Sequence, residues 1–240
     1  HKISSCHILF PNRQDAALFN DMGWLQREGV QFRWENKGYD NFEQFLTNLS
    51  HNKRKKIKQE RKKINNLNIE VTIKQGNLIL DEDIEFFYAC YCNTYMLHNS
   101  SPYLTKEFFY QLNKNMSGKL VFIFAEKEGR RIASALNIIS EQSLYGRYWG
   151  SLEYVPSLHF ELCYYAGQEF CIQNKLKYFE GGAQGEHKLA RGFDAFKTYS
   201  NHFIANSEFK AAIESFLSKE KKYMDIYSNE LEERSPYKGK

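Results

Sequence analysis

Three consecutive strands are predicted between residues 119 and 149, and they narrow the choice of fold. Lys119–Ala125 and Ile132–Ile139 flank the turn Glu128-Gly129-Arg130, and Ser143–Trp149 follows as the third strand. Strands joined by so short a turn pair with each other in antiparallel fashion. The segment therefore predicts a three-stranded meander.

Helical and extended patterns alternate on both sides of this meander. Ile69–Ile73 alternates apolar and polar residues, as a strand does. Helices are also predicted at 15–21, 81–98, 105–115, 158–174 and 207–233, and strands at 6–10, 30–34, 177–180 and 198–205. This order predicts an α+β fold with a mixed, mostly antiparallel sheet flanked by helices.

Composition excludes several classes of protein. The 240 residues are 42% hydrophobic and 26% charged, with a formal net charge of +4, as in ordinary soluble domains. No run of about 18 apolar residues is present that could span a bilayer. The five cysteines lack metal-binding spacing, which predicts reduced thiols in a cytoplasmic protein and no metal site.

A strongly basic helix is predicted around residues 53–67. Eight of the eleven residues from Lys53 to Lys63 are Lys or Arg, and Ile57, Ile64 and Leu67 recur at helical spacing. Such a helix either contacts phosphate, on a cofactor, a tRNA or an anionic membrane surface, or presents a solvated face between two lobes. The candidate phosphate or nucleic-acid contacts are Arg54, Lys55, Lys58 and Arg61.

The third strand of the meander carries an arginine between aromatic residues. Alternation places Tyr145, Arg147 and Trp149 on one face of the strand. An arginine in such a strand needs an anion, because an unpaired buried charge is costly. Two kinds of partner fit: an anionic substrate in a cleft, or a core carboxylate such as Glu161 or Glu180.

The helix predicted at 158–174 could form a second part of a site. Ser157 is its expected N-cap, and a helix N-terminus that follows a strand is a ready anion site. His159 and Glu161 lie in the first turn, so either residue could act as a general base.

The glycine-rich segment 181–192 is the most informative part of the chain. Its four glycines require unusual backbone angles or a close approach to a ligand. It matches neither G-x-x-x-x-G-K-[ST] nor G-x-G-x-x-G after a strand. Ionisable side chains gathered on a loop beside a sheet favour a functional site. The polar residues in question are Gln184, Glu186, His187, Lys188 and Arg191.

Three motifs in order resemble one known family. They are YGRYWG at 145–150, HFELCYY at 159–165 and GAQGEHKLARG at 182–192. This combination is similar to the FemAB-like predicted N-acyltransferases, a family labelled for peptidoglycan biosynthesis or recognition. The likeness runs from about Val30 to Tyr237, nearly the whole chain.

The resemblance implies a fold of the GNAT (acetyltransferase) type in three parts. Residues 1–50 would be the tail of a first GNAT-like lobe, 51–68 the basic helix that links the lobes, and 69–240 a complete second lobe. The implied activity moves an acyl or aminoacyl group from a thioester or a tRNA ester to an amine. The acceptor would be a peptidoglycan precursor, and the co-substrate either acyl-CoA or an aminoacyl-tRNA.

One departure from the GNAT pattern bears on the donor. CoA-binding GNAT enzymes carry an R/Q-x-x-G-x-G/A loop before a helix, whereas residues 150–157 read GSLEYVPS. The resemblance therefore favours an aminoacyl-tRNA over acyl-CoA.

The expected mechanism is direct transfer, with Glu186 or His187 as the general base. Arg147 or backbone amides would stabilise the oxyanion, and Lys188 and Arg191 would hold phosphate. The expected substrate-binding residues are Tyr145, Arg147, Trp149, Gln184, Lys188 and Arg191, and the expected catalytic residues are Glu186, His187, Glu161 and His159.

This mechanism requires Arg147, Glu161 and Glu186 to face one cavity. Two other hypotheses stay open. The chain could be a module that recognises a peptidoglycan precursor or tRNA without turnover, or a degenerate lobe kept for interaction.

Overall fold

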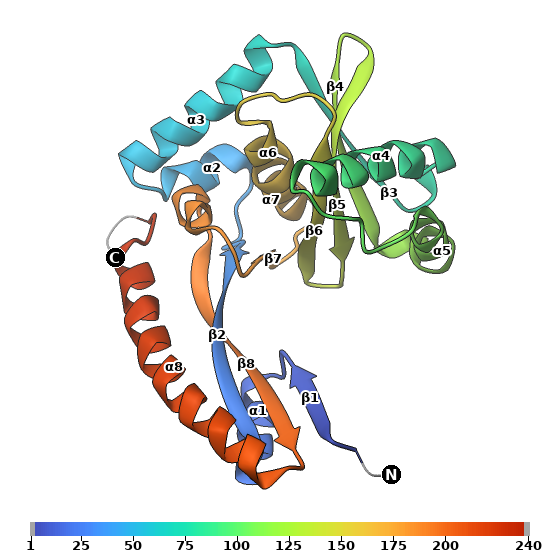
Figure 1. Ribbon diagram of the computed structural model, residues 1–240. Coiled ribbons are helices and arrows are strands. Elements are labelled where there is room, and N and C mark those ends of the chain that lie inside the picture. The colour runs from blue at the N-terminus through green and yellow to red at the C-terminus, as the bar shows by residue number, and fades with distance from the viewer. Residues whose placement is uncertain (1–2, 238–240) are drawn as a thin grey trace. The chain divides into compact units, whose positions relative to one another are not determined.

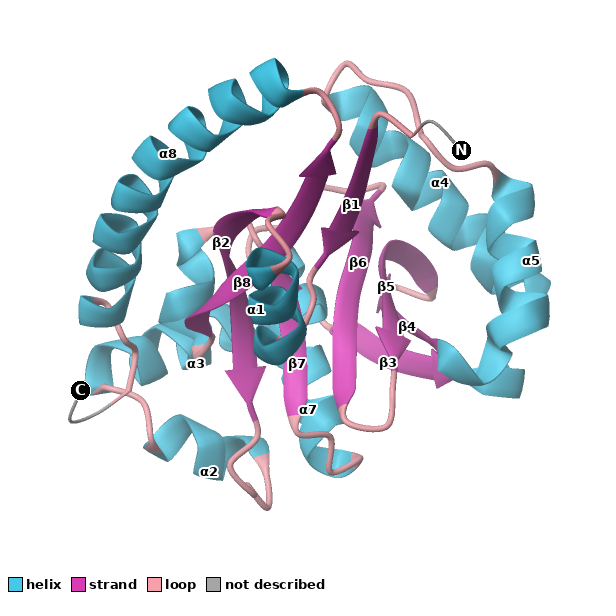
Figure 2. Cartoon of the chain, turned by 90° about the horizontal axis from the view of Figure 1, so that it is seen from below, coloured by secondary structure: helices cyan, strands magenta, loops and turns pink. Residues whose placement is uncertain are grey.

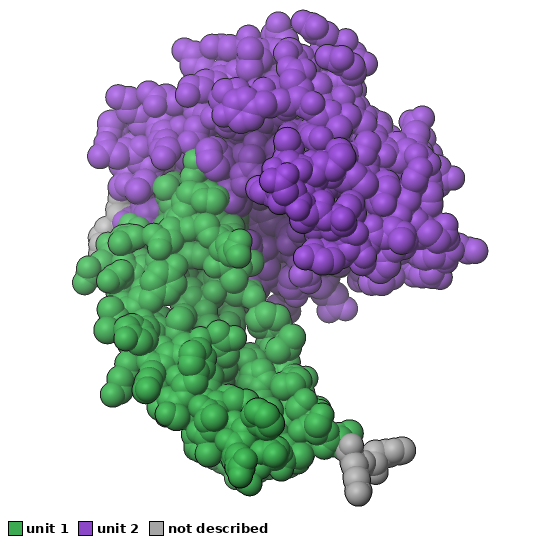
Figure 3. Space-filling view, in the orientation of Figure 1, with its two compact units in different colours: residues 1–33, 182–235, 240 green, residues 34–181, 236–239 purple. Residues whose placement is uncertain are grey.

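The structure, a computed structural model, describes residues 3–237. These residues form two compact units (Figure 3): 3–33 with 182–235, and 34–181 with 236–237. The units do not follow the boundaries predicted at residues 50 and 68. The physical reason is strand pairing, because strands near the two ends of the chain bond to each other.

The first unit is built on three antiparallel strands. β8 lies in the middle, bonded to β1 on one side and to β2 on the other. Two helices, α1 and α8, contact β8. The elements are β1 (Ser5–Leu9), α1 (Arg13–Asp21), β2 (Leu25–Glu35, whose last two residues belong to the second unit), η4 (Glu186–Arg191), β8 (Asp194–Ile204) and α8 (Ser207–Glu233).

The second unit contains a five-stranded sheet in the order β7-β6-β5-β4-β3. The pairs from β6 to β3 are antiparallel, and only β6 and β7 run parallel. The predicted α+β class with a mostly antiparallel sheet is therefore confirmed. The strands are β3 (Ile69–Gln75), β4 (Leu120–Lys127), β5 (Arg130–Ile139), β6 (Ser143–Ser151) and β7 (Tyr178–Gly182).

Helices cover both faces of this sheet (Figures 1 and 2). One core lies between the strands and α3, α6, η3 and α7, and the other lies between the strands and α4 and α5. The helices are α2 (Phe42–Thr47), α3 (His51–Asn66), η1 (Gly76–Leu78), α4 (Asp81–Leu97), α5 (Lys106–Met116), η2 (Ser117–Lys119), α6 (Leu158–Phe160), η3 (Glu161–Tyr165) and α7 (Ala166–Gln173). Buried on both sides, β4 is apolar along nearly its whole length.

Local signals in the sequence account for several boundaries. Glu128 and Gly129 have φ angles of 53° and 72°, as a tight hairpin between β4 and β5 requires. Thr105 caps α5 by accepting a hydrogen bond from the Phe108 amide at 3.3 Å. The terminal helix spans Ser207–Glu233 as predicted, with Asn206 as its cap.

The helix predicted at 158–174 is not continuous. It contains a π-helical turn, η3, between the short helix α6 and α7. The expected cap at Ser157 is also wrong in its chemistry, because Ser157 has a φ angle of 73° and makes no side-chain capping bond. This left-handed residue turns the chain into the helix, and its hydroxyl accepts no capping hydrogen bond from a backbone amide.

Candidate functional site

The two faces of α3 have opposite roles. Ile57 and Ile64 are buried, which confirms the predicted apolar edge, whereas Leu67 lies beyond the helix end and is exposed. Glu60 is also buried on the packed face and accepts a hydrogen bond from the Tyr165 hydroxyl of η3. The packed face of α3 is therefore partly polar.

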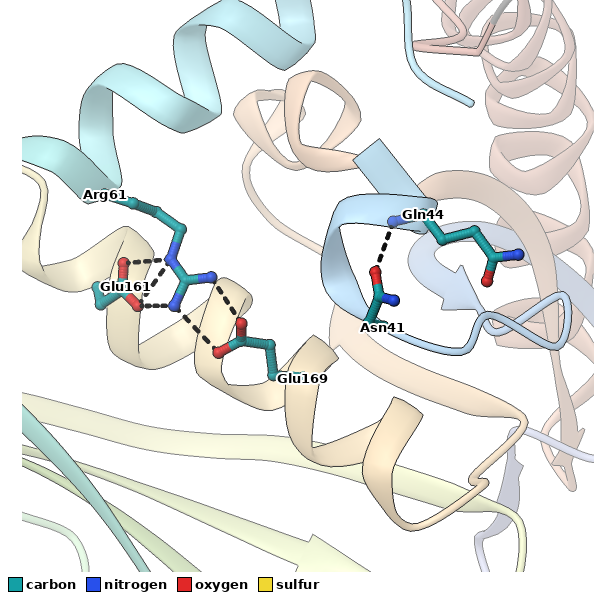
Figure 4. A network of polar contacts seen from close by, with 5 residues as sticks. All are labelled: Asn41, Gln44, Arg61, Glu161 and Glu169. Atoms are coloured by element: carbon teal, nitrogen blue, oxygen red, sulfur yellow. Dashed lines mark hydrogen bonds and ion pairs between the residues drawn. The ribbon is translucent and has the colours of Figure 1, made fainter. Parts of the chain in front are cut away.

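Arg61 lies at the centre of this packed face (Figure 4). Its Nε donates to both carboxylate oxygens of Glu161 at 3.1 and 3.2 Å, and Nη2 donates to Glu161 Oε1 at 2.8 Å. Nη1 and Nη2 donate to the two oxygens of Glu169 at 2.7 and 3.0 Å. All three guanidinium nitrogens are thus engaged by two carboxylates.

An aromatic ring completes the surroundings of Arg61. The guanidinium carbon lies 4.8 Å from the centre of the Phe42 ring, at the start of α2. Asn41 holds that helix start by accepting a hydrogen bond from the Gln44 amide at 2.9 Å (Figure 4). Two carboxylates and a ring surround the charge of Arg61, so each of its guanidinium nitrogens already has an acceptor in place of the phosphate predicted for it.

The π-helical turn explains how one arginine reaches both carboxylates. In an α-helix, residues eight apart point about 80° away from each other, whereas residues seven apart differ by only about 20°. A π turn inserts one extra residue, so Glu161 and Glu169 behave as a pair seven apart. Both carboxylates therefore lie on the face that meets Arg61.

Burial and charge act in opposite directions in this network. Burial disfavours the charged form of Arg61, but hydrogen bonds to Glu169 and Glu161 and their charges outweigh it and raise the pKa of the guanidinium. Burial raises the pKa of Glu161, and the charge and hydrogen bonds of Arg61 offset this only in part. Glu161 is thus buried in an ion pair with Arg61 and is a poor choice for the general base, so the prediction that Glu161 faces a cavity together with Arg147 and Glu186 is wrong for Glu161.

His159 lies among aromatic rings. Its ring is edge-on to Trp149 at 5.4 Å and to Tyr164 at 5.4 Å between centroids. Two predicted site residues, Trp149 and His159, are thereby brought together.

Arg147 occupies an irregularity in β6. Tyr148 pairs with Leu136 of β5, but the next pair joins Gly146 to Asn137, so Arg147 has no partner across the ladder. Such a β-bulge inserts one extra residue into one strand of a pair. The Arg147 side chain is exposed and lies 5.9 Å from the Tyr145 ring, and it has no acidic partner within residues 3–237.

The bulge overturns the prediction that Tyr145, Arg147 and Trp149 share one face. Tyr145 lies opposite Ile138 of β5, and Trp149 lies opposite Ala135. Positions 135 and 138 are an odd number apart, so their side chains point to opposite faces of the sheet. Alternation in the sequence could not predict this, because one inserted residue reverses the face on which every later side chain of the strand lies.

The glycine-rich segment belongs to the first unit and holds itself together. Lys188 and Arg191 are buried at 7% and 2% exposure. Lys188 donates to the Gln184 carbonyl, and Arg191 Nη1 donates to the His187 carbonyl at 2.7 Å. Gly185 has a φ angle of 96°, which confirms that the segment needs glycine.

Two ionisable side chains of this segment are exposed instead. Glu186 accepts a hydrogen bond from Arg234 at 2.6 Å, and the two side chains are about half exposed. His187 is exposed as well. Burial, together with the nearby Glu186 carboxylate, raises the pKa of the Tyr227 hydroxyl. The segment therefore turns its long cationic side chains inward and its potential proton acceptors outward.

Other features bear on membranes and metals. Within residues 3–237, no helix is long and apolar enough to cross a membrane. The same residues contain no group of three or more His, Cys, Asp or Glu side chains placed to hold a metal ion. None of the five cysteines, which all lie within residues 3–237, forms a disulfide, and burial raises the pKa of the Cys90 thiol to about 12.

Solved structures share this fold at low sequence identity. L-PGS from Bacillus licheniformis matches with a TM-score of 0.62 and 12% identity, over 87% of this chain and 71% of that chain. FemX matches with a TM-score of 0.62 and 11% identity, over 89% and 75%. The C-terminal domain of a putative lysylphosphatidylglycerol synthetase from Agrobacterium fabrum matches at 0.59 and 9%, over 90% and 72%.

GCN5-related N-acetyltransferases are also among the structural neighbours, at TM-scores below 0.5. A search of curated protein sequences finds no match. A sequence model of the FemAB-like family, described as peptidoglycan biosynthesis/recognition, matches residues 1–239. Since that match spans nearly the whole sequence, the chain belongs to the FemAB-like family.

Proposed function

We propose that this chain is an N-acyltransferase that moves an acyl or aminoacyl group to an amine acceptor used in peptidoglycan synthesis. The family description supports the connection to peptidoglycan. The fold shared with FemX is compatible with the proposal. The donor is a thioester or a tRNA ester.

The observation that carries the proposal is that the segment 182–192 buries its cationic side chains and exposes Glu186 and His187. Lys188 and Arg191 fix the segment through its own carbonyls, which leaves Glu186 and His187 exposed on a rigid support. A base is effective when it is positioned before the substrate arrives. Glu186 or His187 takes a proton from the ammonium form of the acceptor, and the neutral amine nitrogen then attacks the acyl carbon directly. As the nitrogen–carbon bond forms, the C–S bond of the thioester or the C–O bond of the tRNA ester breaks, and the thiol or the tRNA hydroxyl leaves with the proton that the nitrogen loses.

The partner of Glu186 suits this role. The ion pair with Arg234 lies at the surface, where such pairs contribute only about 0–1 kcal/mol. An incoming ammonium or amine can therefore exchange with Arg234 at little cost.

Arg147, in the second unit, is a separate candidate for binding an anion. It is exposed, it has no carboxylate partner within the described residues, and the bulge makes it stand out from the strand ladder. We assign it contact with an anionic group of the substrate or with the oxyanion. Such donors typically contribute about 10²–10³-fold to the rate.

The test is a transfer assay with mass-spectrometric detection of the acylated acceptor. Purified protein is mixed with pooled acyl-CoA or charged tRNA and with a peptidoglycan precursor. One of the two variants Glu186→Gln and His187→Gln removes the general base, and that variant lowers the transfer rate by about 10²–10⁴-fold. Glu232→Gln, an exposed carboxylate on α8, is the matched control and leaves the rate unchanged.

Two outcomes contradict the proposal. Wild-type rates in both variants would remove Glu186 and His187 from the reaction. An absence of product with every donor, combined with a higher melting temperature in the presence of the precursor, would show a binding module that does not turn over.

A further inference from the structure

Two histidine rings meet on adjacent strands of the first unit. His7 of β1 lies directly opposite His202 of β8 in the antiparallel ladder, so both side chains extend from the same face of the sheet. Their Nδ1 atoms are 2.8 Å apart, and the ring centroids are 5.0 Å apart with an angle of 58° between the ring planes. The two imidazoles therefore face each other through the same ring nitrogen.

A hydroxyl group holds the other nitrogen of each ring. His7 Nε2 lies 3.1 Å from Ser5 Oγ, and His202 Nε2 lies 2.9 Å from Ser200 Oγ. Each serine is two residues from its histidine, on the same face of the same strand. When each Nε2 carries the proton and donates it to the serine oxygen, each Nδ1 keeps a lone pair that faces the other ring. In this tautomer, with a partner on the far nitrogen, an imidazole binds a metal ion through Nδ1.

Either a proton or a metal ion can lie between the two facing nitrogens. A proton on one Nδ1 makes a hydrogen bond to the other, which the 2.8 Å separation allows. A metal ion accepts both lone pairs instead. Two Zn–N bonds of about 2.0–2.1 Å, at an angle of about 90–110°, place the nitrogens about 2.8–3.4 Å apart. The observed separation is at the short end of that range, so a small tilt of the rings lets the pair hold an ion.

We propose that His7 and His202 bind one divalent transition-metal ion of the Zn²⁺ type between their Nδ1 atoms. Imidazole is a preferred ligand of Zn²⁺, Cu²⁺ and Ni²⁺, whereas Mg²⁺ and Ca²⁺ prefer oxygen. His7 is exposed and His202 is half-buried, so water can reach the ion and fill its remaining positions. Groups of three or more metal-binding side chains are absent from residues 3–237, and a site with two protein ligands is expected to exchange its ion with solvent.

A positive charge close to this pair is compensated by the protein. Arg27 of β2 lies opposite Ser200 in the ladder. Its Nε and Nη2 donate to the two carboxylate oxygens of Glu220 on α8, at 2.8 and 2.6 Å. A cation between the histidines therefore meets a paired guanidinium rather than a free one.

A bound ion would fasten an edge strand of the sheet. Within residues 3–237, β1 is bonded only to β8. An ion with one ligand on each strand adds a cross-link that the unfolded chain lacks, so metal binding stabilises the pairing of β1 with β8. The two histidines take no part in the proposed transfer reaction, so this metal site and the proposed function can each fail without the other.

The experiment is a calorimetric titration of the whole chain with Zn²⁺ at about pH 7.5, where imidazole is neutral. Wild type is expected to bind one Zn²⁺ ion. His7→Gln and His202→Gln each remove a ligand, and each lowers the affinity by more than about tenfold. The matched control His51→Gln/His98→Gln removes two exposed histidines of the second unit and keeps the wild-type affinity.

Two further measurements distinguish a metal site from a merely structural contact. Ser200→Ala keeps both ligands but frees the His202 ring, and losing such a partner of a ligand lowers metal affinity by about 10–100-fold. Zn²⁺ is also expected to slow hydrogen exchange of the β1 amides in wild type and not in His202→Gln. Circular dichroism checks that each variant is folded.

Three results would overturn the inference. A titration without saturable binding of Zn²⁺ would show that the two rings only share a proton. Equal affinity in wild type and in both single histidine variants would place the ion elsewhere, for example on the cysteine thiols. Zn²⁺ binding that leaves exchange of the β1 amides unchanged would show that the ion does not bridge the two strands.

Discussion

The π turn in the helix 158–173 and the bulge in β6 each insert one residue into a regular element, but they place charge differently. The π turn aligns Glu161 and Glu169, and both carboxylates are then occupied by Arg61. The bulge removes Arg147 from the strand ladder and leaves it exposed. Irregularity alone therefore does not indicate a ligand site. What matters is whether the chain itself supplies the counter-charge.

The largest expected effect is at the π turn. Arg61→Met leaves Glu161 buried without its partner, and breaking a buried ion pair in this way costs about 3–5 kcal/mol. Urea unfolding measures the loss. Lys62→Met, the exposed neighbour on the same helix, is the control and changes stability by less than about 0.5 kcal/mol. Equal stability of the two variants would show that the network is not structural.

The strand around the bulge offers a second test. A Cβ added at Gly150 would lie 2.0 Å from the Cys90 carbonyl oxygen of α4, whereas one at Gly146 would lie 3.6 Å from its nearest neighbour. Gly150→Ala therefore overpacks a rigid contact and costs about 1–3 kcal/mol or more. Gly146→Ala changes stability by less than about 1 kcal/mol. Similar costs in urea unfolding would contradict the close approach of α4.

Arg147 itself is expected to matter little for folding. Arg147→Gln removes an exposed side chain and changes the free energy of unfolding by less than about 0.5 kcal/mol. The same substitution lowers the transfer rate, because it removes the proposed contact with an anion or oxyanion. If Arg147→Gln lost much stability but kept the wild-type transfer rate, Arg147 would have a structural role and the proposed contact with an anion would be wrong.

The smallest expected effect is a pH dependence at Glu161. Its pKa is raised in the folded protein, mainly by burial, so the folded state favours the protonated carboxyl more than the unfolded state does. This contribution is present below the ordinary pKa of Glu and is lost as the pH rises through the raised value. The stability of wild type relative to Glu161→Gln therefore falls from pH 4 to pH 7. A difference that is constant or rises over this range would contradict the direction.

The regular parts of the fold could be predicted because their signals are local. The turn at Glu128-Gly129, the cap at Thr105 and the helix from Ser207 each depend on residues close in sequence. The alternation of strands and helices likewise gives the α+β class. The family was predicted from the resemblance of three motifs, because composition and periodicity alone do not indicate it.

The site was harder to predict because it depends on single-residue insertions and on distant partners. Periods of 3.6 and 2 contain no sign of the π turn at Glu161 or the bulge at Arg147. Nor did the basic run of α3 reveal which arginine turns inward, since Glu161 and Glu169 lie about a hundred residues further along the chain. The inward direction of Lys188 and Arg191 has the same cause, because burial depends on the completed fold.

A double-mutant cycle on Arg61 and Glu161 tests most directly whether the positive charge of Arg61 is paired with Glu161 inside the protein. The free energies of unfolding of wild type, Arg61→Met, Glu161→Gln and the double variant are measured in urea at pH 7. The structure predicts a coupling energy of about 2–3 kcal/mol between the two side chains, near the upper end for residues in contact. Additivity within about 0.5 kcal/mol would contradict it, because independent side chains cannot hold α3 against the π turn.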